Sequence, residues 1–161
     1  MQTYHSNVIA DFFRSRANPD VGDILSNLKL QKLCYYGAGI MAAVRQDDSR
    51  PLFSDRIEAW THGPVVPAQY ARFRHYGASE IPPIENFDAE QIAARDRMVL
   101  DNVYDFYGQY SAWKLRNMTH EEAPWIAAFA RANKTITTNE LTEFFLNEVD
   151  QDYVKSYHEA G

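Results

Sequence analysis

RIEAWTHGPVVPAQY, residues Arg56 to Tyr70, combines an acid, a Trp, a His, a Gly-Pro step and a second Pro in one short stretch. Ile57 to Trp60 alternates apolar and less apolar side chains with a period of two, which is typical of a short strand. Gly63 can adopt a positive φ, and the proline ring that follows it fixes φ at about −65°. We therefore expect a rigid corner at Gly63-Pro64 immediately after a strand.

Elsewhere the hydrophobic periodicity is helical. The sequence predicts a mainly α, single compact domain spanning residues 1–161, with about seven helices and one very small β element around residues 52–60. Leu52-Phe53 is the candidate partner of the predicted strand. The predicted helices are Asn7–Ala17, Leu28–Val44, Ala68–Tyr76, Asp88–Tyr107, Ala112–Met118, Pro124–Phe129 and Asn139–Asn147, followed by a fraying segment, Asp150–His158.

The segment Leu28–Val44 is apolar on most of its circumference, which predicts a central core helix. Gly37 and Gly39 lower its helix propensity but allow another helix to cross closely. Lys29 and Lys32 interrupt the apolar pattern and share a face of this helix. They fit two interpretations, a solvated stripe or a polar contact to a partner protein.

Composition limits the classes of partner. The chain has 161 residues and a formal charge of −6, which disfavours a broad surface that follows nucleic-acid phosphates and suits a basic protein partner. The chain contains no apolar run near 18 residues and no charged-then-apolar leader, so we expect a cytoplasmic protein with no membrane segment. Aromatic residues reach 14%, an excess expected in the core and at a recognition surface.

Catalytic chemistry has weak support. His62 lies beside Gly63-Pro64, and His120 is followed by Glu121 and Glu122. Both histidines could act as acid–base residues together with Glu58 or Glu121. Because neither accompanies a nucleophile motif or a phosphate-binding loop, the preferred interpretation is that each His orders a structural corner. The single cysteine, Cys34, lies in an apolar helical run and is expected to be buried and inert. No metal-ligand spacing is present, and we expect neither a metal nor a cofactor.

Four sequence blocks resemble one known family. LKLQKLCYY at Leu28–Tyr36, IEAWTHGPVVPAQY at Ile57–Tyr70, YGQYSA at Tyr107–Ala112 and MTHEEAPW at Met118–Trp125 resemble, in order, motifs of the Panacea (SocA-like antitoxin) domain, also described as phage-associated protein. The resemblance covers about residues 27–125. Any one block alone would be a weak signal, whereas four in the family order are specific.

This resemblance implies a non-enzymatic antitoxin of a toxin-antitoxin system, encoded beside its toxin and often carried by prophages as part of phage defence. Family members commonly neutralise a toxin by direct binding, and their toxins include alarmone-synthetase-like translation inhibitors. Two alternatives remain open: an adaptor that delivers the toxin to a ClpXP-type protease, and a His/Glu-based enzyme acting on a small substrate. A DNA-binding autoregulator has the least support, because no helix-turn-helix pattern is visible.

The candidate residues form two groups near the Gly-Pro corner. The structural group contains Gly63, Pro64, His120 and Trp125. The candidate toxin-binding group consists of aromatic and basic side chains, the types that dominate protein interfaces. It comprises Lys29, Lys32, Trp60, His62, Tyr70, Arg72 and Arg74.

Overall fold

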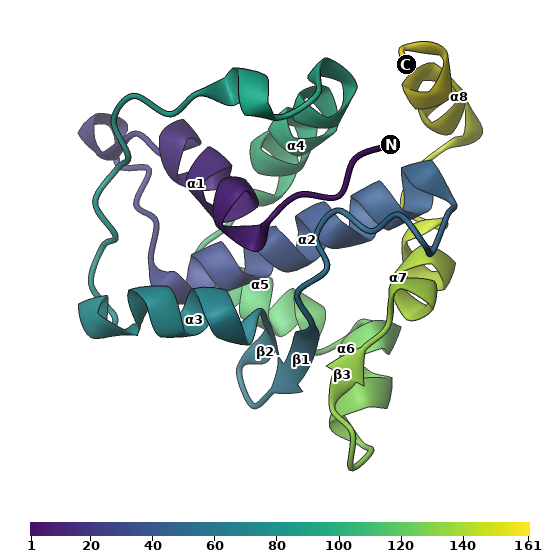
Figure 1. Cartoon of the computed structure of the whole chain (residues 1–161). Helices are drawn as coiled ribbons and strands as arrows, with labels where there is room; N and C mark the ends of the chain where they lie inside the picture. The colour runs from purple at the N-terminus through teal and green to yellow at the C-terminus, as the bar shows by residue number, and fades with distance from the viewer.

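The computed structural model describes residues 1–161 as eight α-helices and a small sheet, so the predicted mainly α class is confirmed (Figure 1). The helices are α1 Ser6–Arg16, α2 Asn27–Arg45, α3 Pro67–Phe73, α4 Ala94–Tyr107, α5 Ala112–Thr119, α6 Ala123–Phe129, α7 Thr138–Phe145 and α8 Gln151–Glu159. The strands are β1 Ile57–Trp60, β2 Gly63–Val65 and β3 Thr135–Ile136. Short 3-10 helices occupy Pro19–Val21, Arg74–Tyr76 and Ala89–Gln91.

The core is organised around α2, which runs through the middle of the molecule (Figure 1). The Ser26 hydroxyl accepts a hydrogen bond from the Lys29 amide at 3.2 Å and caps the start of the helix. Every residue of α2 except Leu28 is buried. Helices α1, α3, α4, α5, α7 and α8 and strand β2 all pack against it. The prediction of a central core helix is therefore confirmed.

A glycine on α2 allows the closest helix approach. The aromatic ring of Phe145, from α7, lies directly against Gly39, and a Cβ atom at position 39 would overlap that ring. Phe145 is fully buried and its ring lies edge-on to Tyr35 at 5.6 Å between centroids. Gly39 thus lowers helix propensity but provides the space that α7 needs to pack on α2.

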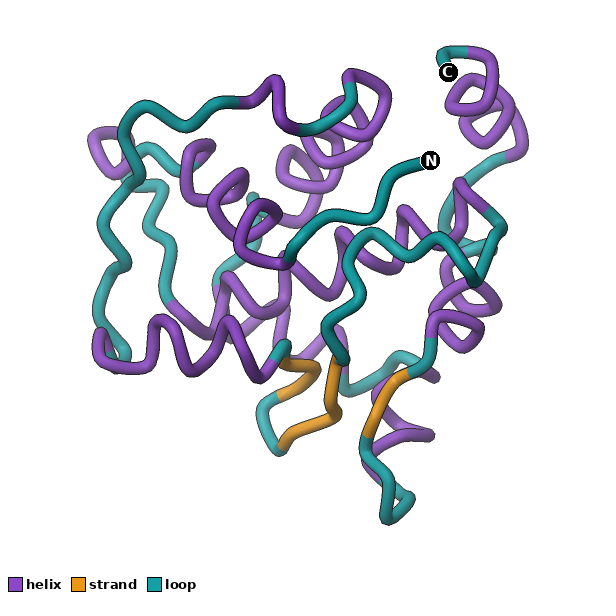
Figure 2. Tube along the Cα trace, in the orientation of Figure 1, coloured by secondary structure: helices purple, strands orange, loops and turns teal.

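The sheet is antiparallel and three-stranded, in the order β2-β1-β3 (Figure 2). Trp60 pairs with Gly63 across a two-residue turn, Thr61-His62, so β1 and β2 form a hairpin. Ile57 pairs with Ile136 on the other edge of β1. The sheet therefore joins the middle of the sequence to a segment more than 70 residues later.

One sequence prediction about this region is wrong. Leu52-Phe53 is not the partner strand of β1: Leu52 accepts a hydrogen bond from the Tyr4 amide at 2.8 Å, and both side chains are buried in the core. The segment directly after the Thr61-His62 turn pairs with β1 in its place. The segment after Trp60 is consequently a second strand as well as a rigid corner.

The predicted helix Asp88–Tyr107 is divided in the structure. Asp88 caps the short 3-10 helix Ala89–Gln91, and Ile92 is extended, with φ −109° and ψ 128°. The side chain of Ile92 is fully buried, so this break lets it reach the core before α4 begins. No proline or glycine marks the break in the sequence, which is why periodicity alone misses it.

A buried ion pair joins the C-terminal end of α2 to both chain ends. The side chains of Arg45 and Asp96 are 0% and 1% exposed and approach to 3.0 Å. The hydroxyls of Tyr4 and Tyr157 each donate a hydrogen bond to Asp96 at 2.6 Å. Because a buried carboxylate is costly unless its oxygens are satisfied, these bonds make the pair tolerable in the core. Burial and the Asp96 carboxylate raise the pKa of Tyr4.

The helices of this protein do not reach the length and hydropathy that crossing a bilayer requires. The longest of them, α2, carries Lys29, Lys32 and Arg45 among its buried residues.

Truncation of the core helix tests this packing. Leu33 is 0% exposed at the centre of α2. Leu33→Ala should lower the free energy of unfolding by roughly 2–5 kcal/mol, because it removes buried methyl groups and leaves a cavity. Chemical denaturation measures this loss. Met98→Ala is the control, because Met98 is 46% exposed on α4, and its effect should stay within about 0.5 kcal/mol. Equal losses in the two variants would contradict the assigned core.

Candidate functional site

The hairpin β1-β2 depends on Gly63. This residue has φ +104°, a backbone conformation that residues with a Cβ rarely adopt. A Cβ atom at position 63 would lie 2.6 Å from Lys32 Cε and 2.8 Å from Thr119 Oγ1. Gly63 is therefore required both for the backbone angle and for the close approach of α2 and α5. The positive φ predicted from the sequence is confirmed.

Beneath the hairpin, two polar side chains of α2 hold its backbone. The Lys32 ammonium group is fully buried and donates a hydrogen bond to the Pro64 carbonyl oxygen at 3.0 Å. The Gln31 side-chain oxygen accepts a hydrogen bond from the Val66 amide at 3.0 Å. Burial, with a smaller effect from the Arg116 guanidinium, lowers the pKa of Lys32 to about 7.

The interpretation of Lys29 and Lys32 as a solvated stripe is wrong, since they are 7% and 0% exposed. Lys29 donates to the Gly108 carbonyl at 2.7 Å, which fixes the loop between α4 and α5. Burial lowers the pKa of Lys29, and Asp23 partly offsets this effect. The two lysines therefore bond backbone carbonyls inside the fold, a role that helical periodicity cannot distinguish from exposure.

His120 and Trp125 also support the hairpin. Trp125 Nε1 donates to the Trp60 carbonyl oxygen at 2.8 Å, and the His120 ring stacks on Trp125 with 3.9 Å between centroids. Burial and the neighbouring Arg116 lower the pKa of His120, and its Nε2 is buried without a hydrogen-bond partner. A neutral, stacked ring of this kind fits a structural His and disfavours a general acid–base role.

The carboxylate nearest to the hairpin is already engaged. Glu58 accepts hydrogen bonds from Trp60 Nε1 at 3.0 Å and from Arg56 Nε at 2.5 Å. These bonds, the one from Trp60 first, lower the pKa of Glu58. His62 is exposed in the turn, where its ring lies 5.7 Å from that of Trp113. The hairpin thus holds no paired His and carboxylate.

A cleft of about 580 Å³ opens beside the hairpin. Its walls come from the start of α2, the hairpin, α3 and the segment from α6 to β3, and we call it the hairpin cleft. The Trp60 and Tyr70 rings meet edge to face at 5.0 Å, and Tyr70 is 38% exposed. The residues of the cleft that carry its chemistry are Lys32, Trp60, His62, Tyr70, Arg74, Phe129 and Lys134.

The structure brings together most, but not all, of the candidate binding residues. Trp60, His62, Tyr70 and Arg74 line the hairpin cleft, with Lys32 at its floor. Arg72 is oriented differently: its guanidinium bonds both oxygens of Asp11, at 2.9 and 3.0 Å, and covers the ring of Phe73. Arg72 is thus part of the contact between α1 and α3.

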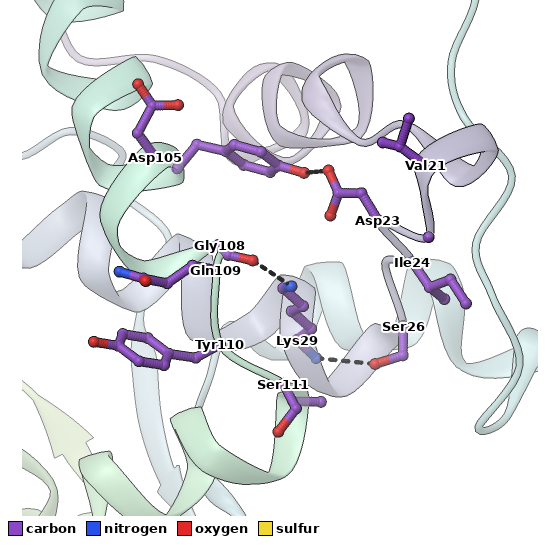
Figure 3. A pocket seen from close by; sticks show the side chains of 13 residues that line it. Val21, Asp23, Ile24, Ser26, Lys29, Asp105, Gly108, Gln109, Tyr110 and Ser111 are labelled. Atoms are coloured by element: carbon purple, nitrogen blue, oxygen red, sulfur yellow. Dashed lines mark hydrogen bonds between the residues drawn. The ribbon is translucent and has the colours of Figure 1, made fainter.

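Lys29 belongs to a second hollow of about 720 Å³, between the α1–α2 loop and the α4–α5 loop (Figure 3). The Tyr104 hydroxyl donates a hydrogen bond to Asp23, and both residues line this hollow. The Lys29 side chain extends to Gly108. The charged groups of Asp23 and Lys29 in this hollow are therefore hydrogen-bonded to other groups of the protein.

Glu122 is an internal residue that the sequence reasoning did not single out. Its carboxylate oxygens accept hydrogen bonds from the hydroxyls of Tyr35 and Tyr36, both at 3.0 Å. Burial raises the pKa of Glu122 to about 7, although the two tyrosine hydrogen bonds act in the opposite direction. The sequence does contain a signal for this contact: Tyr35-Tyr36 end the first of the four blocks, and Glu122 lies in the fourth.

Two other expectations concern reactive groups. Cys34 is buried, and burial raises the pKa of its thiol to about 12, so the prediction of an inert cysteine is confirmed. No group of three or more His, Cys, Asp or Glu side chains is arranged to hold a metal ion.

A comparison with protein families identifies one match. The family model described as "Antitoxin SocA-like, Panacea domain" matches residues 30–126. The matched range contains most of α2, the hairpin, Glu122 and Trp125, and therefore most of the hairpin cleft. Comparisons with curated proteins and with solved structures give no significant match.

Substitution of the hairpin glycine tests the close approach. Gly63→Ala should destabilise the protein by more than about 1 kcal/mol, because it combines an unfavourable φ with a clash against Lys32 and Thr119. Gly77→Ala is the matched control: Gly77 has φ +58°, but open space surrounds its Cβ position. Thermal denaturation should show a larger loss of stability for Gly63→Ala than for Gly77→Ala. Equal losses would contradict a steric clash at position 63.

The buried ammonium group predicts a pH dependence. Folding lowers the pKa of Lys32 from 10.5 to about 7, so between these values the unfolded chain binds one more proton than the folded protein. The contribution of Lys32 to the free energy of unfolding should therefore rise with pH in this window, by up to about 1.4 kcal/mol per pH unit. Below pH 7 both states are protonated and the contribution is constant.

The measurement is the difference in unfolding free energy between the wild type and Lys32→Met across the pH range. This difference should increase from neutral to alkaline pH. Lys155→Met provides the control, because the Lys155 side chain is 73% exposed. A flat difference for Lys32→Met would mean that Lys32 titrates normally in the folded protein.

Proposed function

Because the chain belongs to the family of SocA-like antitoxins with a Panacea domain, we propose that this protein is the antitoxin of a toxin-antitoxin system. It neutralises a cognate toxin encoded beside it by direct protein–protein binding. The complex is a hetero-oligomer of toxin and antitoxin, formed in the cytoplasm. The family resemblance also suggests the kind of toxin, an alarmone-synthetase-like inhibitor of translation, and a prophage setting.

The observation that carries this proposal is the convergence of sequence blocks at the hairpin cleft. Lys32 and Gln31 come from the first block, the hairpin from the second, and Thr119, His120 and Trp125 from the fourth. All of them stabilise one hairpin whose outer face carries Trp60 and His62. Many interior contacts therefore fix the position of one small hairpin. This arrangement fits a protein that uses the hairpin to bind its partner.

The side chains of the cleft match the chemistry of protein interfaces. Binding energy at interfaces concentrates in a few aromatic and Arg side chains. Trp60, Tyr70 and Arg74 provide such side chains around one concave surface. We assign these residues and His62 to toxin contact, and assign Lys29, Lys32 and Arg72 to holding the surface in place.

The enzymatic alternative has less support from the geometry. A general base must reach its substrate and hold a suitable protonation state. His120 is stacked beneath the hairpin, and Glu58 is bonded to Trp60 and Arg56. Delivery of the toxin to a ClpXP-type protease remains compatible with toxin binding, and it is separated from occlusion by the experiment below.

Co-expression tests the proposal. The neighbouring gene product should arrest growth when expressed alone, and co-expression of this protein should restore growth and yield a complex by affinity purification. Tyr70→Ala should weaken rescue, because it removes an aromatic wall of the cleft. Phe106→Ala should leave rescue unchanged, because Phe106 is 53% exposed on α4, outside the cleft.

A neighbour that is harmless alone would contradict the antitoxin function. Rescue without a detectable complex would contradict direct occlusion. In that case the lifetime of the toxin decides the alternative: a shortened lifetime that depends on the protease would establish delivery for degradation.

A further inference from the structure

The hairpin cleft differs in charge from the rest of the molecule. The protein as a whole has a formal charge of −6. The cleft nevertheless contains the two exposed cationic residues Arg74 and Lys134, together with His62, and none of its lining residues is Asp or Glu. A basic, concave surface on an acidic protein focuses a positive potential at that one place.

Nothing within the protein neutralises this cluster. Arg74 is exposed and takes part in none of the ion pairs of the structure. Lys134 Nζ donates to the Phe129 carbonyl at 2.7 Å and lies 4.6 Å from the centre of the Phe129 ring. These groups therefore keep capacity for an anionic partner.

The walls of the cleft are aromatic. The rings of Trp60 and Tyr70 meet edge to face in the lining, and Phe129, also a lining residue, is stacked on Trp125 at 4.6 Å between centroids. Phe129 is 36% exposed. An occupant that combines an acidic group with an adjacent apolar or aromatic side chain would satisfy both the cations and the rings.

We propose that the hairpin cleft binds an acidic segment of the toxin, with acidic side chains facing the exposed cations Arg74 and Lys134 and apolar side chains against Trp60, Tyr70 and Phe129. This inference rests on the proposed antitoxin function and specifies which part of the partner the cleft accepts. The overall negative charge favours a basic partner, whereas the positive charge of the cleft favours an acidic segment of that partner. The acidic outer faces can still attract a basic toxin, while the cleft selects one acidic segment of it.

The sign of a charge substitution distinguishes this proposal from its opposite. Arg74→Gln removes a cation, and Arg74→Glu replaces it with an anion. If the occupant is acidic, toxin affinity measured by calorimetry should fall by a few fold for Arg74→Gln and by about tenfold or more for Arg74→Glu. If the occupant is basic, Arg74→Glu should bind more tightly than the wild type, which would overturn the proposal.

Lys155→Glu on α8 is the matched control, since it makes the same change in net charge at a residue outside the cleft. It should leave affinity within about twofold of the wild type. Equal weakening by Lys155→Glu and Arg74→Glu would indicate a general charge effect and contradict the cleft assignment. Each variant must also retain the wild-type melting temperature, and Lys134→Gln replaces Arg74→Gln if the latter does not.

Charge-reversal substitutions on the toxin identify the acidic segment. Among single Asp→Lys and Glu→Lys substitutions of the toxin, at least one should weaken binding to the wild-type antitoxin and restore binding to Arg74→Glu. If the wild type binds the toxin and no substitution at Arg74 or Lys134 alters affinity, only this inference fails. If the wild type forms no complex with the toxin, the proposed function fails with it.

Discussion

A buried ammonium group on the central helix is the constraint on which the hairpin depends. Lys32 has no water to hydrate it, so its donors must find oxygen atoms inside the protein, and the Pro64 carbonyl provides one at 3.0 Å. Gln31, one residue earlier, accepts from the Val66 amide. These contacts bring α2 so close to β2 that only glycine fits at position 63. The hairpin is therefore held by polar contacts from below, and its outer face is left for recognition.

Buried polar groups serve the same purpose elsewhere in the fold. Lys29 fixes the α4–α5 loop through the Gly108 carbonyl, and Arg45 with Asp96 ties both chain ends to α2. An apolar core would stabilise the helices but would leave loop positions poorly defined, because hydrophobic contacts are not directional. Hydrogen bonds from buried side chains to loop carbonyls set specific positions, and breaking one would leave an unsatisfied group in the core.

The stacked ring of His120 is not paired with the two acids that follow it in the sequence. The two acidic residues after His120 point in different directions. Glu122 points inward to Tyr35 and Tyr36, and Glu121 is exposed. His120 instead lies flat on Trp125, which donates to the hairpin backbone. Trp125 thus braces β1 through the Trp60 carbonyl oxygen, and the His120 ring packs on Trp125.

The amino-acid sequence by itself determined the mainly α class, the central helix, the positive φ of Gly63 and the inert Cys34, because periodicity and the conformational limits of glycine are local properties. It located the hairpin residues Trp60, His62 and Gly63, but predicted the wrong partner for their strand. Only the tertiary structure decided that Lys29 and Lys32 are buried, that Arg72 bonds Asp11, and that Arg74 and Lys134 share a cleft. The physical reason is that burial and charge proximity arise from contacts between residues distant in the chain. A helical repeat gives the side of a helix on which a side chain lies, but not what packs against that side.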